Sequence, residues 1–234
     1  MTGLYRIAGK TVEIVSLHDK VHRLCREYRA EGTAELSLCV AEEDIAYERA
    51  HADRAYSDAY LETLAVYRQL AEAMPRWDTL LLHGSALAAD GVGYLFTAPS
   101  GTGKSTHARL WREYLGERAV MINDDKPLLH VGENEITVYG TPWNGKHHLG
   151  SNTSAPLRAV CFLEQAAENR ITPLAAAQAY PRLLAQAYRP QDGAALKKTL
   201  ALLDRLCSRV RFYSLCCNME PEAARISYET MSKE

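Results

Sequence analysis

Apolar and polar residues alternate in short runs near the start of the chain, a pattern typical of half-buried β-strands. Residues 4–17 predict two strands joined by a hairpin at Gly9 and Lys10, and residues 35–41 predict a third strand. Residues 44–50 are expected to extend the same sheet. Residues 58–74 carry leucines and a methionine at helical spacing, which predicts an amphipathic helix that ends before a proline.

The middle of the chain consists of apolar runs separated by turn residues. Residues 79–97 predict a strand, an Asp-Gly turn and a second strand, followed by a glycine-rich loop and a helix. An apolar run at 119–125 ends in two carboxylates, and residues 135–150 predict a strand followed by a loop rich in glycine and proline. Later elements are expected as a strand at 157–165, helices at 181–187, 195–207 and 221–231, and a strand at 210–217.

These elements predict an α/β fold, a mixed sheet with flanking helices. The 234 residues suit one large domain, and no internal repeat, low-complexity stretch or linker divides them. We therefore expect a single domain over residues 1–234. Its parts are N-terminal strands and a helix over 1–78, a central core over 79–165, and a mainly helical C-terminal part over 166–234.

Composition narrows the class of partner. The formal net charge of −2 offers no electrostatic reason to expect nucleic acid or an anionic membrane as a partner. No apolar run resembles a secretory signal or a bilayer span, so we expect a cytoplasmic protein.

The six cysteines show no metal-ligand spacing and are expected to be structural thiols. His147 and His148 would face opposite ways on a strand, so no zinc site is expected.

The stretch APSGTGKST, residues 98–106, lies between a predicted buried strand and a predicted helix. Gly103, Lys104 and Ser105 match the P-loop pattern, with Ala98 in place of its leading glycine. Glycines let backbone N–H groups point inward, and the helix N-terminus adds partial positive charge, which predicts a phosphate cradle. The residues expected to bind a nucleotide are Ser100, Gly101, Thr102, Gly103, Lys104, Ser105 and Thr106. Lys104 is expected to be solvated and to reach the terminal phosphates, and the Ser105 hydroxyl to hold Mg²⁺.

Asp124 and Asp125 follow the loop by about twenty residues. Phosphoryl transfer to a hydroxyl needs a carboxylate for Mg²⁺ and a base for the hydroxyl proton. We expect the strand that ends in these carboxylates to lie directly beside the strand before the loop, in a parallel sheet, which brings both groups to the phosphates. A solvated Asp-Asp turn is the alternative. No motif for guanine selection is present.

The segment LHGSALAADGVGYLFTAPSGTGKST, continued by VMINDDKPLL, resembles the catalytic core of HPr kinase/phosphorylase and, more distantly, phosphoenolpyruvate carboxykinase. In that family a His-Gly pair, a strand pair, the P-loop and an Asp-Asp pair follow in this order, as do His83-Gly84, the loop and Asp124-Asp125 here. The close resemblance covers about residues 80–165. Short kinases of this type, encoded beside peptide-modifying enzymes, resemble the whole chain more loosely. The resemblance implies a P-loop domain of this type.

The resemblance also implies roles for individual residues. Asp124 would take the proton from the acceptor hydroxyl, while Asp125 and Ser105 would hold Mg²⁺. His83 would lie at the base of the site and support the aspartate's charge. A histidine packed in the core is the alternative for His83.

The chain departs from the family in two places. Thr106 stands where HPr kinase carries an acidic residue, and the loop that supports dephosphorylation by phosphorolysis is not recognisable. In its general area, Lys146 is a candidate charge for the transition state and Trp143 a candidate contact for the acceptor. A packed turn is the alternative for this loop. The second set of metal-binding residues found in the carboxykinases is absent, so decarboxylation is not expected.

The resemblance implies an ATP- and Mg²⁺-dependent kinase that phosphorylates a Ser/Thr hydroxyl of a peptide or small protein. Two alternatives stay open: a nucleotide-binding regulatory module with little or no transfer activity, and a kinase of a small molecule such as free serine. Assembly into a homo-oligomer also stays open.

Overall fold

The computed structural model describes residues 1–145 and 148–233. It divides into two compact units: unit 1, Met1–Met74, and unit 2, Pro75–Glu234. This boundary lies close to the expected one between residues 78 and 79. The single domain over 1–234 stays a prediction, because the compactness of the parts does not measure how cooperatively they unfold.

Unit 1 contains a three-stranded sheet in the order β1-β2-β3. Its strands are β1 (Thr2–Ile7), β2 (Lys10–Val15) and β3 (Leu36–Cys39). The predicted hairpin is confirmed, but its turn is at Ala8 and Gly9 rather than at Gly9 and Lys10, and both turn residues have positive φ, 48° and 76°. Such a turn matches the right-handed twist of the two strands. β3 pairs with β2 in parallel, which requires the longer connection between them.

Three helices complete unit 1: α1 (Lys20–Leu24), α2 (Glu42–His51) and α3 (Asp58–Ala73), with a short 3₁₀ turn at Arg26–Tyr28. The expectation that residues 44–50 extend the sheet is wrong, since they belong to α2. The Asp44 carboxylate accepts the Ala41 N–H at 3.2 Å, which caps the start of this helix. Arg68 of α3 forms ion pairs with Asp44 and Glu48 of α2, at 2.8 and 2.6 Å.

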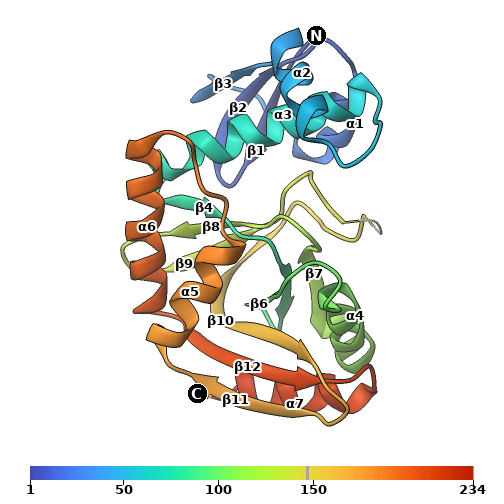
Figure 1. Ribbon diagram of the computed structural model, residues 1–234, viewed down its shortest axis with the longest axis vertical. Coiled ribbons are helices and arrows are strands. Elements are labelled where there is room, and N and C mark those ends of the chain that lie inside the picture. Colours follow the sequence, from blue (N-terminus) through green and yellow to red (C-terminus); the bar gives the residue numbers. More distant parts are fainter. Residues whose placement is uncertain (146–147, 234) are drawn as a thin grey trace. The chain divides into compact units, whose positions relative to one another are not determined.

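Unit 2 is built on a nine-stranded mixed sheet (Figure 1). Its main path runs β4-β8-β9-β10-β6-β5-β7; β12 pairs with β10, and β11 pairs with β12. The strands are β4 (Thr79–Leu81), β5 (Ser85–Ala89), β6 (Val92–Thr97), β7 (Ala119–Asn123), β8 (Leu128–Val131), β9 (Ile136–Tyr139), β10 (Ser154–Gln165), β11 (Arg170–Leu174) and β12 (Arg211–Cys217). The long strand β10 pairs antiparallel with β9 at its start and parallel with β6 and β12 further on.

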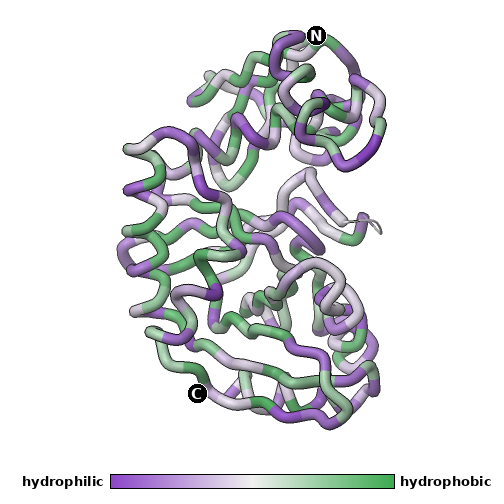
Figure 2. Tube along the Cα trace, in the orientation of Figure 1, coloured by the Kyte–Doolittle hydropathy of each residue, from purple (hydrophilic) through white to green (hydrophobic). Residues whose placement is uncertain are grey.

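Helices cover both faces of this sheet (Figure 1). They are α4 (Lys104–Leu115), α5 (Ala176–Gln186), α6 (Gly193–Cys207) and α7 (Pro221–Met231), with 3₁₀ turns at Met74–Trp77 and Gly116–Arg118. Val160 and Phe162 of β10 pack into the core shared with α5 and α6, whereas Cys161 and Leu163 pack into the core shared with α4 and α7. Burial on both faces explains why β10 is a nearly continuous apolar run. In Figure 2 the turns of α6 alternate between green and purple, as expected for a helix with one buried face.

Several details of unit 2 differ from the expected elements. The strand expected before the Asp-Gly turn is divided into β4 and β5, with His83 and Gly84 between them. A Cβ added to Gly84 would lie 2.8 Å from the Phe96 carbonyl oxygen, so only glycine allows this close crossing of β6. Strands β8 and β11 were not expected, and α5 extends on both sides of Pro181 rather than beginning there.

The position of β7 is also different from the expected one. β7 was expected directly beside β6, but β5 lies between them and is antiparallel to both. β6 and β7 therefore run in the same direction, and their carboxyl ends meet the start of β5 at one edge of the sheet. In the described part of the chain, no helix has the length and apolar character needed to cross a bilayer.

The tight crossing at Gly84 predicts a specific instability. Gly84→Ala should lower the free energy of unfolding by about 1–3 kcal/mol, because the added methyl group collides with β6 backbone that cannot easily move. Gly193→Ala is the matched control, since no atom lies within 4 Å of its added Cβ. Urea unfolding of both variants would test this, and equal unfolding midpoints would contradict it.

Candidate functional site

Three parts of the chain that are distant in sequence meet at one edge of the unit 2 sheet. The register pairs Ser85 with Phe96 and Ala86 with Asn123, so the start of β5 lies beside the ends of β6 and β7. They surround a cavity of about 470 Å³, here named the edge cavity. Its lining residues are His83, Ser100, Gly101, Gly103, Lys104, Ser105, Thr106, Asp124, Asp125 and Gly145.

Most of the residues singled out in the sequence thus line one cavity. Thr102 is an exception, because it lines a neighbouring cavity of about 400 Å³ instead. Lys146 lies outside the described residues. Trp143 is 5% exposed and is not among the residues that line the edge cavity.

The glycine loop, residues 98–103, joins the end of β6 to the start of α4. Gly101 and Gly103 have φ of 81° and 109°, a region that L-residues rarely adopt. No atom outside the adjoining residues lies within 4 Å of a Cβ built on either glycine, so a ligand could approach this backbone closely. The first N–H groups of α4 have no partner within the helix and carry its positive end. The loop therefore suits an anion.

Lys104 is the first residue of α4 and is 7% exposed, so the expectation of a solvated lysine is wrong. Its Nζ donates hydrogen bonds to the carbonyl oxygens of Ala98 and Pro99, at 2.9 and 3.1 Å. Burial lowers the pKa of Lys104, an effect that the Asp125 carboxylate partly opposes. The ammonium group is therefore held against the loop backbone at the end of β6.

Asp124 is buried, with 3% of its surface exposed. Its Oδ1 accepts the Gly145 N–H at 2.6 Å, whereas its Oδ2 has no hydrogen-bond partner among the described residues. A buried carboxylate oxygen without a partner is costly, and it is suited to accept a proton or a hydrogen bond from a ligand. A Cβ on Gly145 would lie 2.9 Å from this oxygen. No motif in the sequence singles out Gly145, although it belongs to a loop rich in glycine and proline.

Asp125 has different surroundings. The Nε2 atom of His83 lies 3.2 Å from its Oδ1, and Nζ of Lys126 lies 3.6 Å from its Oδ2. Burial by itself would raise the pKa of Asp125, but the hydrogen bond from His83 and the charge of Lys126 outweigh it and hold the pKa below its ordinary value. Asp125 is therefore ionised at neutral pH. His83 lies beside Asp125 rather than Asp124.

Asn123 holds the Asp-Asp turn in place, a role that no motif in the sequence predicts. Its Oδ1 accepts the N–H groups of Asp125 and Lys126 at 2.9 and 2.6 Å. Its Nδ2 donates to the carbonyl oxygens of Thr141 and Trp143 at 3.1 and 3.2 Å. The side chain thus ties the turn to the loop that carries Gly145. An Asn two residues before a turn amide is a known local signal.

Gln186, at the end of α5, positions His83 from the other side. The His83 N–H donates to the Gln186 carbonyl oxygen at 2.9 Å, and the His83 ring Nδ1 lies 3.2 Å from the Gln186 side-chain oxygen. No local pattern could have identified Gln186, because more than a hundred residues separate it from His83.

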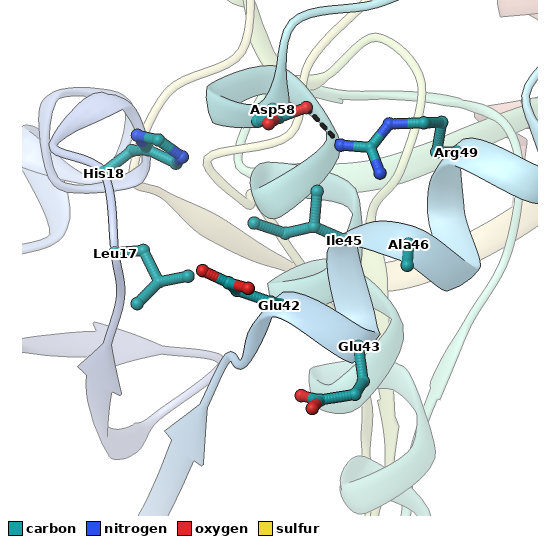
Figure 3. A pocket seen from close by; sticks show the side chains of 8 residues that line it. All are labelled: Leu17, His18, Glu42, Glu43, Ile45, Ala46, Arg49 and Asp58. Carbon is teal, nitrogen blue, oxygen red and sulfur yellow. Dashed lines mark hydrogen bonds and ion pairs between the residues drawn. The ribbon is translucent and has the colours of Figure 1, made fainter.

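Unit 1 contains a larger cavity, of about 630 Å³ (Figure 3). In Figure 3 the Arg49 guanidinium reaches Asp58, with which it forms an ion pair, and Glu42 and Glu43 lie at the start of α2. Both of these glutamates are exposed to solvent. Buried charged groups are instead found in the edge cavity, which is therefore the candidate functional site.

The 400 Å³ cavity is here named the α4 cavity. It shares Gly101, Gly103 and Thr106 with the edge cavity. His107, 2% exposed, also lines it, and burial lowers the pKa of this histidine to about 4. The imidazole is therefore neutral at pH 7.

Comparison with known proteins identifies the family. The family model for the SynChlorMet cassette protein ScmC matches residues 57–218, and the chain belongs to this family. No curated protein matches the chain. Among solved structures, the HPr(Ser) kinase/phosphatase from Coxiella burnetii is similar, with 11% identity, over 65% of this chain and 99% of that chain. The TM-score of this match is 0.37, which is too low to establish a shared fold.

The contacts of Asp125 predict a pH dependence of stability. Its pKa is lower in the folded than in the unfolded chain, so the unfolded chain binds more protons in the acid range. The stabilisation is fully present above the ordinary carboxyl pKa of about 3.9 and is lost as pH falls through the lowered value. The difference in unfolding free energy between wild type and Asp125→Asn should therefore shrink below about pH 4. Urea unfolding across the acid range would measure it, and a difference independent of pH would contradict the pairing.

Proposed function

We propose that this ScmC-family protein is an ATP- and Mg²⁺-dependent kinase that transfers the γ-phosphate to a Ser/Thr hydroxyl of a peptide or small protein. The observation that carries the proposal is the meeting, in one cavity, of an open glycine loop, Lys104 and two carboxylates with different surroundings. The resemblance of residues 80–165 to HPr kinase motifs supports the same reading.

The glycine loop supports nucleotide binding through charge and space. Triphosphate oxygens would lie against the backbone of Gly101 and Gly103, where no side chain blocks their approach. The start of α4 supplies N–H donors, and Lys104 supplies a full positive charge. To reach a terminal phosphate, the Lys104 ammonium would exchange its two carbonyl partners for phosphate oxygens.

Ser105 and Asp125 suit a magnesium ion. Asp125 is ionised at neutral pH, and oxygen donors are the ligands that Mg²⁺ prefers. Across residues 1–145 and 148–233, no group of three His, Cys, Asp or Glu side chains forms a cage for a metal ion. Such a site fits Mg²⁺, which usually takes one or two protein ligands and completes its shell with phosphates and water. When bound, Mg²⁺ neutralises charge on the transferred phosphoryl group.

Asp124 suits the role of general base. Gly145 holds its Oδ1, so Oδ2 is the atom that would receive the proton of the acceptor hydroxyl. The acceptor oxygen then bonds to the γ-phosphorus, the bond between that phosphorus and the β–γ bridging oxygen breaks, and ADP leaves. His83 orients Asp125 and does not touch the reacting atoms in this scheme.

Two alternatives are less well supported. A regulatory module that binds ATP without transfer would need a carboxylate for Mg²⁺. It would have no use for Asp124, which is buried and has an oxygen without a partner among the described residues. A small-molecule kinase would use the same chemistry on another acceptor. The name of the family refers to a cassette protein, and we therefore propose a peptide or small protein of such a cassette as the acceptor.

Asparagine variants of the two aspartates separate base from metal ligand. Asp124→Asn keeps the shape of the side chain but cannot take a proton, so phosphate transfer should slow by about 10² to 10⁴-fold while ATP binding changes little. Asp125→Asn should instead raise the Mg²⁺ concentration needed for half-maximal activity, because it removes a metal ligand. Single-turnover transfer and ATP titration at several Mg²⁺ concentrations measure both effects. Equal, small effects would favour the regulatory module.

Replacing Lys104 tests the nucleotide site itself. Lys104→Ala removes the positively charged side chain proposed to lie against the terminal phosphates, so ATP turnover should fall to background in a protein that still folds. Lys198→Ala is the matched control, since Lys198 pairs with Asp78 and is not among the residues lining either cavity beside the glycine loop. Circular dichroism would confirm folding of both variants. Wild-type turnover by folded Lys104→Ala would refute the nucleotide site.

A further inference from the structure

The α4 cavity lies at the ends of the strands on the far side of β6 from the Asp-Asp turn. β10 and β12 run parallel to β6, and residues directly after both strands line this cavity. β5 and β7, which lead to the edge cavity, are on the opposite side of β6. The glycine loop separates the two cavities and lines both of them. A ligand whose phosphates follow this loop could therefore extend into the α4 cavity.

His107 lines the α4 cavity, and the neighbours of its two ring nitrogens bear on their hydrogen-bonding roles. The Ser227 hydroxyl donates its one hydrogen within α7, with the Ala223 carbonyl oxygen at 2.7 Å, and it accepts the Trp111 Nε1–H at 2.8 Å. The Nε2 atom of His107 lies 3.1 Å from the same hydroxyl oxygen. With the Ser227 hydrogen directed to the Ala223 carbonyl oxygen, we assign the ring hydrogen of His107 to Nε2.

The other ring nitrogen of His107 is then a bare acceptor. Nδ1 is buried and has no hydrogen-bond partner among the residues that the structure describes. A buried acceptor of this kind is costly unless a ligand supplies a donor. In this tautomer Nδ1 offers a lone pair to a ligand.

The remaining walls are mixed: Thr102, Gln165 and Asn218 are polar, whereas Leu110, Ala166 and Met219 offer apolar surface to a flat ligand. Leu110, one helical turn after His107 on α4, is buried, and Met219, shortly after β12, is 75% exposed. A thioether adapts its shape and packs well against aromatic rings. The cavity volume of about 400 Å³ is within the range of small-molecule sites. An aromatic heterocycle that carries an amino group satisfies both the walls and the acceptor.

We propose that the α4 cavity binds the base of the nucleotide and that His107 Nδ1 accepts a hydrogen bond from the exocyclic amine of adenine. This inference rests on the proposed function, since it places the base of the same nucleotide whose phosphates occupy the edge cavity. Guanine carries an acceptor oxygen where adenine carries its amine, so the lone pair of His107 would repel it. The geometry thus makes His107 a specificity-determining residue for ATP over GTP.

Binding of three probes to the full chain tests the inference. The probes are ATP, GTP and inorganic tripolyphosphate, each with Mg²⁺, titrated by calorimetry. Wild type should bind ATP more tightly than both others, while tripolyphosphate reports on the glycine loop alone. Equal affinity for ATP and tripolyphosphate would overturn the base site while leaving the phosphate site intact. Binding of none of the three would instead refute the proposed function.

Two variants test whether His107 and Met219 contact the base of ATP. His107→Gln can keep a donor toward Ser227 but lacks the Nδ1 acceptor, and it should weaken ATP binding by about 3- to 10-fold, the net worth of one hydrogen bond. Met219→Ala should weaken ATP binding similarly, and it should leave folding intact because Met219 is exposed. Neither variant should change tripolyphosphate binding.

The controls distinguish the base site from general damage. Val120→Ala removes an exposed apolar side chain from β7 outside the α4 cavity and should leave all three affinities unchanged. If His107→Gln fails to fold, Met219→Ala alone decides the question. Wild-type ATP affinity in folded Met219→Ala and His107→Gln, or a parallel loss of tripolyphosphate binding in both, would overturn the inference.

Discussion

The candidate site depends on one constraint of the sheet: β5 separates β6 from β7 and runs against both of them. Two strands separated by one antiparallel strand point the same way, so the glycine loop and the Asp-Asp turn emerge at the same edge. The chain enters β5 at that edge through His83 and Gly84. The close approach of Gly84 to the β6 backbone keeps these segments within one cavity, because a larger residue would push them apart.

Adjacent carboxylates acquire different chemistry from this arrangement. Asp125 receives a hydrogen bond from His83 and the charge of Lys126, which favour its ionised form. Asp124 is held through one oxygen by the Gly145 N–H, and its other oxygen stays unpartnered among the described residues. Asn123 fixes the turn between them and the loop that carries Gly145. The difference between the two carboxylates therefore comes from the residues that contact them rather than from the aspartates themselves.

The glycine loop separates two cavities with complementary chemistry. The edge cavity is lined by charged groups, whereas the α4 cavity is lined by uncharged polar and apolar residues together with the His107 imidazole. The order of the strands produces this division, since the sheet continues from β6 through β5 and β7 on one side and through β10 and β12 on the other. An ATP molecule has the same division between its triphosphate and its base.

Local patterns in the sequence were sufficient to predict the glycine loop, the carboxylate pair, the N-terminal hairpin and α3. Each of these depends on residues close together in the chain: glycines that permit positive φ, alternating apolar positions, and helical spacing. The pattern failed at residues 44–50, where ion pairs with Arg68 stabilise a helix, and at residues 79–89, where Gly84 breaks the strand.

Contacts between distant residues were decided only in the folded chain. The insertion of β5 between β6 and β7, the burial of Lys104 against the Ala98 and Pro99 carbonyl oxygens, and the contact of Gln186 with His83 depend on strand order and on packing of the helices. The same holds for His107, whose Nε2 contacts a serine hydroxyl on another helix. Residue types and their spacing can identify the groups able to perform chemistry, but which groups become partners depends on how the sheet brings their segments together.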